Sequence, residues 1–224
     1  MTDRLIGLCG QKQSGKSSST SYIRSRLKSR VVIERSFAVL LKEFCIETLG
    51  LTRKQCGFED GTEEDKNSLT NIRWENVDSF FRKKYGRIIV DDTSGISREL
   101  KTGRMTAREV MQVQGELQRS FFYQDIWVDA LFRRINKQQP CDHRMVNVVS
   151  DVRHLNEIEK VLSEDGFIIH LLRGKNGDVA DSEAELLSIK WNKYDRVYHI
   201  DNSEMTIDEK NEEINKILKT EGLL

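Results

Sequence analysis

The sequence predicts an α/β domain in which a mostly parallel sheet is covered by helices on both faces. Short apolar runs alternate along the chain with segments of helical periodicity, as repeated βαβ units require. The first apolar run, Leu5–Cys9, ends at a glycine-rich loop that opens a helix. The chain of 224 residues suits one such domain carrying an insertion.

The first fifty residues predict two strands, each followed by a helix. Apolar residues recur at helical spacing after the glycine-rich loop, and again in a longer run that Gly50 stops. The predicted ranges are strands 5–9 and 31–33 and helices 16–28 and 37–49.

The stretch from 51 to 103 changes in character and predicts an insertion. It is polar, and acidic residues cluster at 59–65. We expect one amphipathic helix at 71–85 and a short strand at 88–90. The chain is therefore divided into a core of residues 1–50 and 104–224 and a substrate-side insertion of residues 51–103.

The second half returns to alternating elements. Thr106 is predicted as an N-cap with Glu109 as its capping-box partner, opening a helix that runs to about Phe122. Asp125 caps the next helix, 126–137. The remaining ranges are strands 145–149, 167–172 and 197–200 and helices 156–163, 182–189 and 206–219.

Composition excludes several classes of protein. The 36 Lys and Arg balance 36 Asp and Glu, which argues against a nucleic-acid or membrane-surface binder. No apolar run approaches the roughly 20 residues that span a bilayer. The four cysteines are far apart, as in a protein with reduced thiols, and Cys9 is predicted in the core. We expect a cytoplasmic protein.

The pattern G-x-x-x-x-G-K-[S/T] is met at Gly10, Gly15, Lys16 and Ser17, between a predicted strand and a helix. Glycines let backbone N–H groups turn toward phosphate oxygens, and the helix points its positive end at the same anion. Lys16 would reach the β- and γ-phosphates, and the Ser17 hydroxyl would bind Mg²⁺. This motif predicts a P-loop that holds the phosphates of ATP. The residues assigned to the nucleotide are Gly10, Gln13, Ser14, Gly15, Lys16, Ser17 and Ser18.

Two short patterns match motifs that are typical of GTPases. Asp92–Gly95 matches D-x-x-G, and Asn192–Asp195 matches the guanine-reading N-K-x-D. A guanine-reading pair belongs at the carboxyl end of a buried strand, whereas here it precedes strand 197–200. The GTPase is therefore kept only as an alternative.

One predicted helix carries a polar stripe on an otherwise apolar segment. At about 100° per residue, Arg108, Gln112, Gly115 and Arg119 face one direction. Two arginines so placed can hold a phosphate or neutralise charge between two phosphates, and Gly115 leaves room for a ring or a close backbone. A solvated face with a helix contact at the glycine explains the spacing equally well.

Asp151 and Arg153 follow the predicted strand 145–149. A carboxylate at the end of a central strand can hold Mg²⁺ or orient the attacking group, with Arg153 beside the same charge. The alternative is that Asp151 caps a helix and Arg153 lies on the surface.

At these residues the chain resembles the phage-type deoxynucleoside monophosphate kinases, in order along most of its length. The resemblance also covers further segments. They are Phe37-Ala38 with Lys42, the segment that begins at Leu51, Met111-Gln112 and Trp127. The tail motifs are Ser182-Glu183, Asp195 and Asn202, and Glu157 follows the Asp-x-Arg strand end. The family often has Asp-Thr after the loop lysine, where this chain has Ser17-Ser18.

The resemblance implies transfer of the ATP γ-phosphoryl to a deoxynucleoside monophosphate. Lys16, Asp151, Arg153 and Arg108 would be catalytic, with Ser17 and Asp151 as Mg²⁺ ligands. The acceptor would be bound by Lys42, Arg108, Gln112, Arg119 and Trp127. The resemblance leaves a homodimer open, and a phage origin would place the chain in the host-cell cytoplasm. Kinases of other small acceptors such as dephospho-coenzyme A, and a nucleotide-binding regulator, stay as alternatives.

Overall fold

A computed structural model describes residues 4–92, 95–138, 144–173, 186 and 188–224. The chain forms two compact units. Residues 1–37 and 128–224 make the first, called the core unit, and residues 38–127 make the second unit. The division of the sequence into a core and an insertion at 51–103 stays a prediction.

The core unit contains the predicted parallel sheet. Its five strands lie in the order β2-β7-β1-β8-β9, and every neighbouring pair is parallel. The strands are β1 (Arg4–Gly10), β2 (Val31–Arg35), β7 (Met145–Val152), β8 (Phe167–Leu172) and β9 (Val197–Asp201). β1, β7 and β8 are buried along almost their whole length, which explains their continuous apolar sequences.

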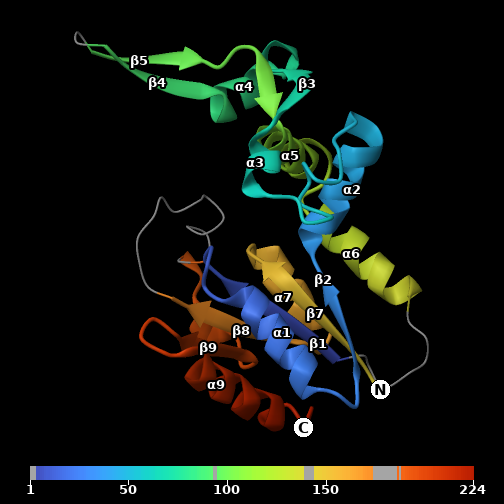
Figure 1. The fold of residues 1–224 in the computed structure, drawn as a ribbon. Helices are drawn as coiled ribbons and strands as arrows, with labels where there is room; N and C mark the ends of the chain where they lie inside the picture. Colours follow the sequence, from blue (N-terminus) through green and yellow to red (C-terminus); the bar gives the residue numbers. More distant parts are fainter. Residues whose placement is uncertain (1–3, 93–94, 139–143, 174–185, 187) are drawn as a thin grey trace. The chain divides into compact units, whose positions relative to one another are not determined.

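Helices cover both faces of this sheet (Figure 1). On one face, α1 (Lys16–Arg26) and α9 (Ile207–Thr220) bury Ile23, Ile214 and Leu218 against side chains of the strands. On the other, α7 (Leu155–Ser163) packs at Gly7, where a Cβ would lie 3.4 Å from Val161. Because strand residues alternate between faces, Gly7 faces away from its neighbours Ile6 and Leu8, which belong to the first layer. The α/β P-loop kinase fold predicted from the sequence is confirmed.

The second unit has its own apolar core. Cys45, Trp74, Phe81, Met105 and Val110 are buried in it. Its helices are α2 (Phe37–Leu49), α3 (Glu63–Asn67), the 3₁₀ turn η1 (Trp74–Asn76), α4 (Ser79–Tyr85), α5 (Ala107–Leu117) and the π-helical turn η2 (Gln118–Phe122). Its strands form two antiparallel pairs, β3 (Leu69–Arg73) with β6 (Arg104–Thr106), and β4 (Arg87–Asp92) with β5 (Gly95–Leu100). α6 (Ile126–Lys137) begins in this unit and continues into the core unit.

The helix predicted at 71–85 is wrong over its first half. Residues 69–73 form a strand in which Thr70 and Ile72 turn inward while their neighbours are exposed, a period of two instead of 3.6. The helix begins only at Ser79, where the Asp78 carboxylate accepts a hydrogen bond from the Phe80 N–H at 2.8 Å. The predicted helix 182–189 lies outside the described residues, except for residues 186 and 188.

Several other predictions are confirmed. The helices 37–49 and 126–137 and the strand 167–172 have the predicted limits. The capping box of Thr106 and Glu109 is present. Cys9 lies in the core, and burial raises the pKa of its thiol to about 12, so the thiol stays protonated.

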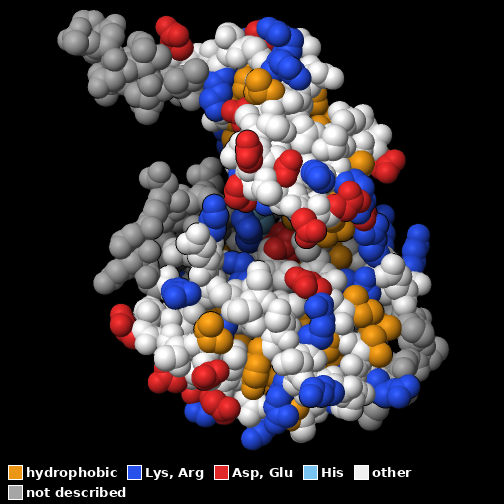
Figure 2. Space-filling view, in the orientation of Figure 1, with side chains coloured by type: hydrophobic (Ala, Val, Ile, Leu, Met, Phe, Trp, Pro, Cys, Tyr) orange, Lys and Arg blue, Asp and Glu red, His pale blue; other side chains and the backbone are white. Residues whose placement is uncertain are grey.

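The surface agrees with the balanced composition. Lys and Arg side chains are interspersed with Asp and Glu on the visible face of each unit (Figure 2). Over the described residues, no helix is both long and apolar enough to cross a membrane.

Candidate active site

The phosphate loop lies at the carboxyl end of β1, in the middle of the sheet. Gly10 has φ 143°, and a Cβ there would lie 2.5 Å from the Leu171 carbonyl oxygen, so only glycine fits. Gln13 and Gly15 also have positive φ, at 64° and 97°. Gly15 directly precedes α1, so the N–H groups of the first turn of α1 face the space that the loop encloses.

Lys16 closes the loop from inside. Its Nζ donates to the carbonyl oxygens of Gly10 and Gln11, both at 2.7 Å. Ser17 is exposed, and its hydroxyl makes no hydrogen bond with any residue that the structure describes. An arriving phosphate would offer Lys16 charged oxygens in place of neutral carbonyls, which are the weaker acceptors.

Two residues that follow β9 contact the loop. Asn202, which follows β9, donates from Nδ2 to the Ser14 carbonyl oxygen at 3.0 Å. Lys210 on α9 donates from Nζ to the Ser18 hydroxyl at 2.6 Å. Both Asn202 and Lys210 are buried, with 4% and 3% of their surface exposed. The sequence singled out Asn202 only through the family resemblance and missed Lys210, whose charged helix reads as a solvated face.

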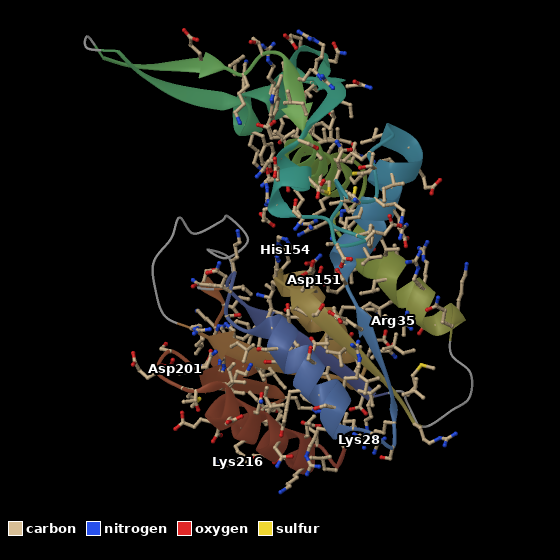
Figure 3. All side chains as sticks on the ribbon, in the orientation of Figure 1. Lys28, Arg35, Asp151, His154, Asp201 and Lys216 are labelled. Atoms are coloured by element: carbon tan, nitrogen blue, oxygen red, sulfur yellow. The ribbon has the colours of Figure 1, made fainter. Side chains whose placement is uncertain are left out.

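Asp151 lies inside β7, which ends at Val152 and not at 149 as predicted. Its two carboxylate oxygens accept hydrogen bonds from the Ser36 hydroxyl at 2.7 Å and the Phe37 N–H at 2.9 Å. It therefore caps the first residue of α2. Because Val152 is paired with Cys9, Asp151 lies at the same sheet edge as the phosphate loop. Figure 3 shows Asp151 and His154 at this end of the core unit and Lys28 at the other.

Arg153 is positioned through its backbone. The Glu157 carboxylate, on a residue only 3% exposed, accepts from the N–H groups of Arg153 at 2.7 Å and His154 at 3.1 Å. His154 is the N-cap of α7. The Arg153 side chain is exposed and, within the described part of the chain, has no partner. The structure thus brings the phosphate loop, Asp151 and Arg153 to one edge of the core unit.

The other predicted site residues belong to the second unit. Arg108 donates from Nε to the Asn67 side-chain oxygen at 3.1 Å and forms a close ion pair with Glu63. Gln112 is exposed on α5. The α-helical geometry that aligned Arg119 with Arg108 ends at Leu117, because Arg119 lies in the π-helical turn η2.

Gly115 is a packing position. A Cβ on it would lie 2.9 Å from the Leu41 side chain, so α2 fills the space that the sequence predicted for a ring or a close backbone. Trp127 is 7% exposed and donates from Nε1 to the Gly115 carbonyl oxygen at 3.3 Å, which supports α5. Lys42, on α2, lies 5.1 Å from the centroid of the Phe58 ring.

The GTPase patterns are not placed to read a nucleotide. Asn192 and Lys193 lie in the 3₁₀ turn η3 (Trp191–Lys193), at the amino end of β9. Asp92 and Gly95 pair with each other at the end of the β4–β5 hairpin, in the second unit. The Asn192-Lys193 pattern is therefore at the wrong end of its strand, because ligands bind at the carboxyl ends in this class of fold, and the Asp92–Gly95 pattern is not part of the five-stranded sheet.

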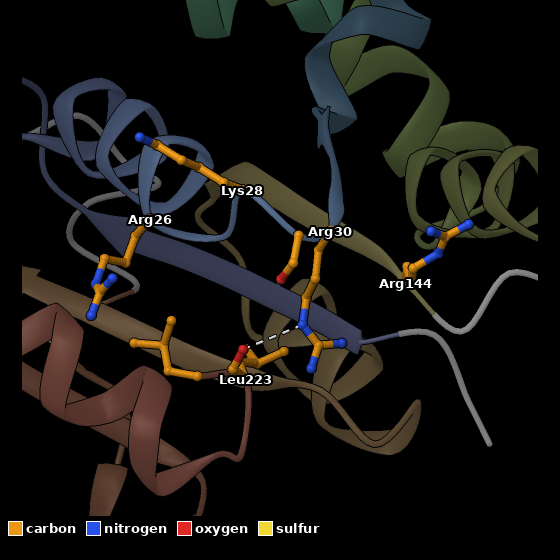
Figure 4. Close-up of a pocket in the computed structure, with 7 residues that line it drawn as sticks. Arg26, Lys28, Arg30, Arg144 and Leu223 are labelled. Atoms are coloured by element: carbon orange, nitrogen blue, oxygen red, sulfur yellow. Dashed lines mark hydrogen bonds between the residues drawn. The ribbon is translucent and has the colours of Figure 1, made fainter.

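A cationic groove lies at the opposite edge of the core unit. Its volume is about 820 Å³, and Arg26, Lys28, Arg30 and Arg144 line it (Figure 4). The Arg30 guanidinium donates to the Leu223 carbonyl oxygen at 3.3 Å. Since Arg30 and Arg144 precede β2 and β7, the groove is at the amino ends of the strands, away from the phosphate loop. The phosphate loop is therefore the candidate active site.

Similarity to a viral protein gives the family of the chain. A protein of Acanthamoeba polyphaga mimivirus named "Putative deoxynucleotide monophosphate kinase" is 31% identical over 191 residues, covering 83% of each chain. No family model matches the chain.

Two solved structures align over 99% of the chain at low similarity. Thymidylate kinase from Candida albicans aligns over 93% of its own length, with a TM-score of 0.42 and 14% identity. A protein of Borrelia burgdorferi B31 described as a plasmid partition protein bound to AMPPNP aligns over 100% of its length, with a TM-score of 0.35 and 11% identity. The fold is therefore assigned from the sheet of this chain alone, and the family from the viral relative. On that similarity the chain belongs to the nucleotide monophosphate kinases of the P-loop type, and it is a phosphotransferase.

Proposed function

We propose that this chain transfers the γ-phosphoryl group of ATP to a deoxynucleoside 5′-monophosphate, giving the diphosphate and ADP. The observation that carries the proposal is the phosphate loop, with its positive-φ glycine, inward lysine and helix N-terminus at the carboxyl end of β1. The name of the viral relative supports the choice of acceptor. We expect a cytoplasmic enzyme that binds no nucleic acid.

The donor would be held by the loop, Gly10 to Ser18. Main-chain N–H groups of the loop and of the first turn of α1 would bind the phosphates, and Lys16 would leave its two carbonyl partners for the β- and γ-phosphates. Moving an already positioned ammonium onto the transferring group neutralises charge where it develops in the transition state.

The donor set at the loop fits Mg²⁺. The exposed Ser17 hydroxyl and the Asp151 carboxylate are hard oxygen ligands of the kind that Mg²⁺ prefers. When bound, the ion would shield the charge on the phosphates. Asp151 would act through water, because both its oxygens accept hydrogen bonds from Ser36 and Phe37. Arg153 would stabilise the transferring group with its exposed guanidinium.

The acceptor would be bound by residues of the second unit. Arg108 and Arg119 would bind its phosphate, Gln112 would read the nucleotide, and Lys42 would add a further phosphate contact. Trp127 would act indirectly, by supporting α5 at Gly115. The ion pair of Arg108 with Glu63 keeps the guanidinium oriented, and the incoming phosphate would compete with that carboxylate. The chemistry then needs positioning and charge neutralisation rather than a covalent intermediate.

The test is a panel of acceptors with ATP and Mg²⁺, read as nucleoside diphosphate formed. We expect turnover with at least one deoxynucleoside monophosphate, and about 100-fold or greater loss for Lys16→Ala, since a charged group at the transferring phosphoryl is removed. Lys28→Ala is the matched control, because Lys28 is an exposed lysine of the core unit at the opposite edge. Turnover confined to non-nucleotide acceptors would refute the proposed acceptor class.

Arg108→Ala tests the acceptor site separately. We expect kcat/KM for the monophosphate to fall at least about tenfold while the affinity for ATP is unchanged, since a charge-assisted hydrogen bond is lost. Arg73→Ala is the control, because Arg73 is also an exposed arginine of the second unit paired with a glutamate. Equal kcat/KM values for the Arg108→Ala and Arg73→Ala variants would show that the ion pair of Arg108 with Glu63 is only structural.

A further inference from the structure

Lys210 is a buried cation without a counter-charge in the described part of the chain. Only 3% of its surface is exposed, and its ammonium donates to the Ser18 hydroxyl at 2.6 Å. It has no ion pair with any described carboxylate. The neighbouring charge that acts on it is another cation, Arg173, and burial together with Arg173 lowers the pKa of Lys210. Burying an unpaired ammonium is costly, so its position calls for a reason other than stability.

The place of Lys210 on its helix is also electrostatically unfavourable. Lys210 is the fourth residue of α9, in the first turn, where the helix dipole disfavours a cation. A Cβ on Gly15 would lie 3.4 Å from its Nζ, so the ammonium directly touches the phosphate loop. The amino terminus of α1, which Gly15 directly precedes, adds to the positive potential at the same place. Several positive groups that face one another point to an anion that neutralises them.

The hydrogen bonds of Ser18 indicate how that anion would be bound. The Ser18 hydroxyl accepts from Lys210 and donates to the Gly15 carbonyl oxygen at 2.9 Å. Rotation of this hydroxyl would free its proton for an incoming oxygen beside the ammonium. In loops of this kind the motif lysine takes the β- and γ-phosphates, while the backbone holds the α- and β-phosphates. The phosphate left for a second cation at Ser18 is the α-phosphate.

We propose that Lys210 binds the α-phosphate of the donor nucleotide, together with the hydroxyl of Ser18. This inference rests on the proposed function only in that the donor is a nucleoside triphosphate held in the loop. Asn202 keeps the loop in place for this contact by its hydrogen bond to the Ser14 carbonyl oxygen. The family motif contributes one lysine from the loop, and the fold adds another from a helix almost two hundred residues further along the chain.

The experiment measures the dissociation constants of ATP and of ADP for the full chain and for Lys210→Met, by calorimetry. Methionine keeps most of the side-chain volume and removes the charge. We expect both affinities to fall by the same factor, about 10- to 100-fold, because both nucleotides carry an α-phosphate. Lys210→Arg should retain most of the affinity, since it restores the charge. Lys216→Met, on an exposed lysine of the same helix, should bind as the wild type does.

Thermal unfolding without nucleotide separates binding from structure. Without nucleotide, removing a buried, unpaired cation should leave the melting temperature unchanged or raise it. Lys210→Met should therefore lose only the increase in melting temperature that ATP causes in the wild type. A lower melting temperature without nucleotide, or affinities equal to those of the wild type, would overturn the proposal. A loss confined to ATP would move the contact to the γ-phosphate and also overturn it. A wild-type protein that binds ATP and ADP but phosphorylates no acceptor would refute the proposed function and leave this inference standing.

Discussion

Two histidines on neighbouring strands predict that the core unit loses stability in mild acid. His170 and His199 are directly paired in the register of β8 and β9, and their Nδ1 atoms are 3.2 Å apart. His170 is 6% exposed, and the centroid of its ring is 4.4 Å from that of Trp191. Burial, followed by the nearby His199, lowers the pKa of His170 from 6.5 to about 4.

The sign follows from the two protonation states. Well above pH 6.5 His170 is neutral in both the folded and the unfolded chain, so it contributes no pH dependence there. Below pH 6.5 the unfolded chain takes up a proton that the folded chain refuses until about pH 4, so stability is lost as the pH falls through this window. At 1.36 kcal/mol per pH unit, the loss between pH 6.5 and pH 5 is about 2 kcal/mol.

The assay is urea unfolding of the wild type and His170→Asn between pH 7.5 and pH 4.5. Asparagine can hydrogen-bond to His199 but does not titrate, so carboxylate effects common to both proteins cancel in the difference. We expect the free energy of unfolding of the wild type to fall relative to that of the variant by about 2 kcal/mol between pH 6.5 and pH 5. Parallel curves for the two proteins would show that His170 titrates normally and refute the reasoning.

Three further variants test single contacts by chemical unfolding. Gly10→Ala should lower the free energy of unfolding by more than about 2 kcal/mol, because its Cβ would meet a backbone oxygen; a cost no larger than that of Gly50→Ala, where φ is positive but the space is open, would contradict this. Thr106→Ala should lose about 1 kcal/mol with the cap of α5, and an unchanged value would mean that the cap is not needed. Glu157→Ala leaves two backbone N–H groups without their acceptor and should lose about 1 to 3 kcal/mol, whereas a neutral result would show that water replaces the carboxylate.

Local rules predicted most of the fold. The capping box of Thr106 and Glu109 and the apolar run of Phe167–Leu172 depend only on neighbouring residues, and both are present as predicted. The helix predicted at 71–85 is wrong over its first half, and Trp74 and Phe81 are buried in the second unit from two different elements, η1 and α4. Tertiary packing decided the structure there.

The candidate site was predictable only where it consists of neighbouring residues. The phosphate loop is a contiguous motif, so its placement at the end of β1 follows from the sequence. The Asp151 carboxylate could be placed at a strand end, but its hydrogen bonds to Ser36 and Phe37 join segments more than a hundred residues apart. Lys210 carried no sequence signal, because a lysine in a charged helix looks like a solvated residue until its burial is known.

The sheet order has a consequence for synthesis of the protein. β1 leaves the ribosome first, yet both its neighbours, β7 and β8, begin only at Met145 and Phe167. The side chains that brace the loop, Asn202 and Lys210, emerge later still. A nascent chain therefore carries its nucleotide-holding segment without strand neighbours until β7 and β8 have been made, and the segment is braced for ATP only after Lys210 has emerged.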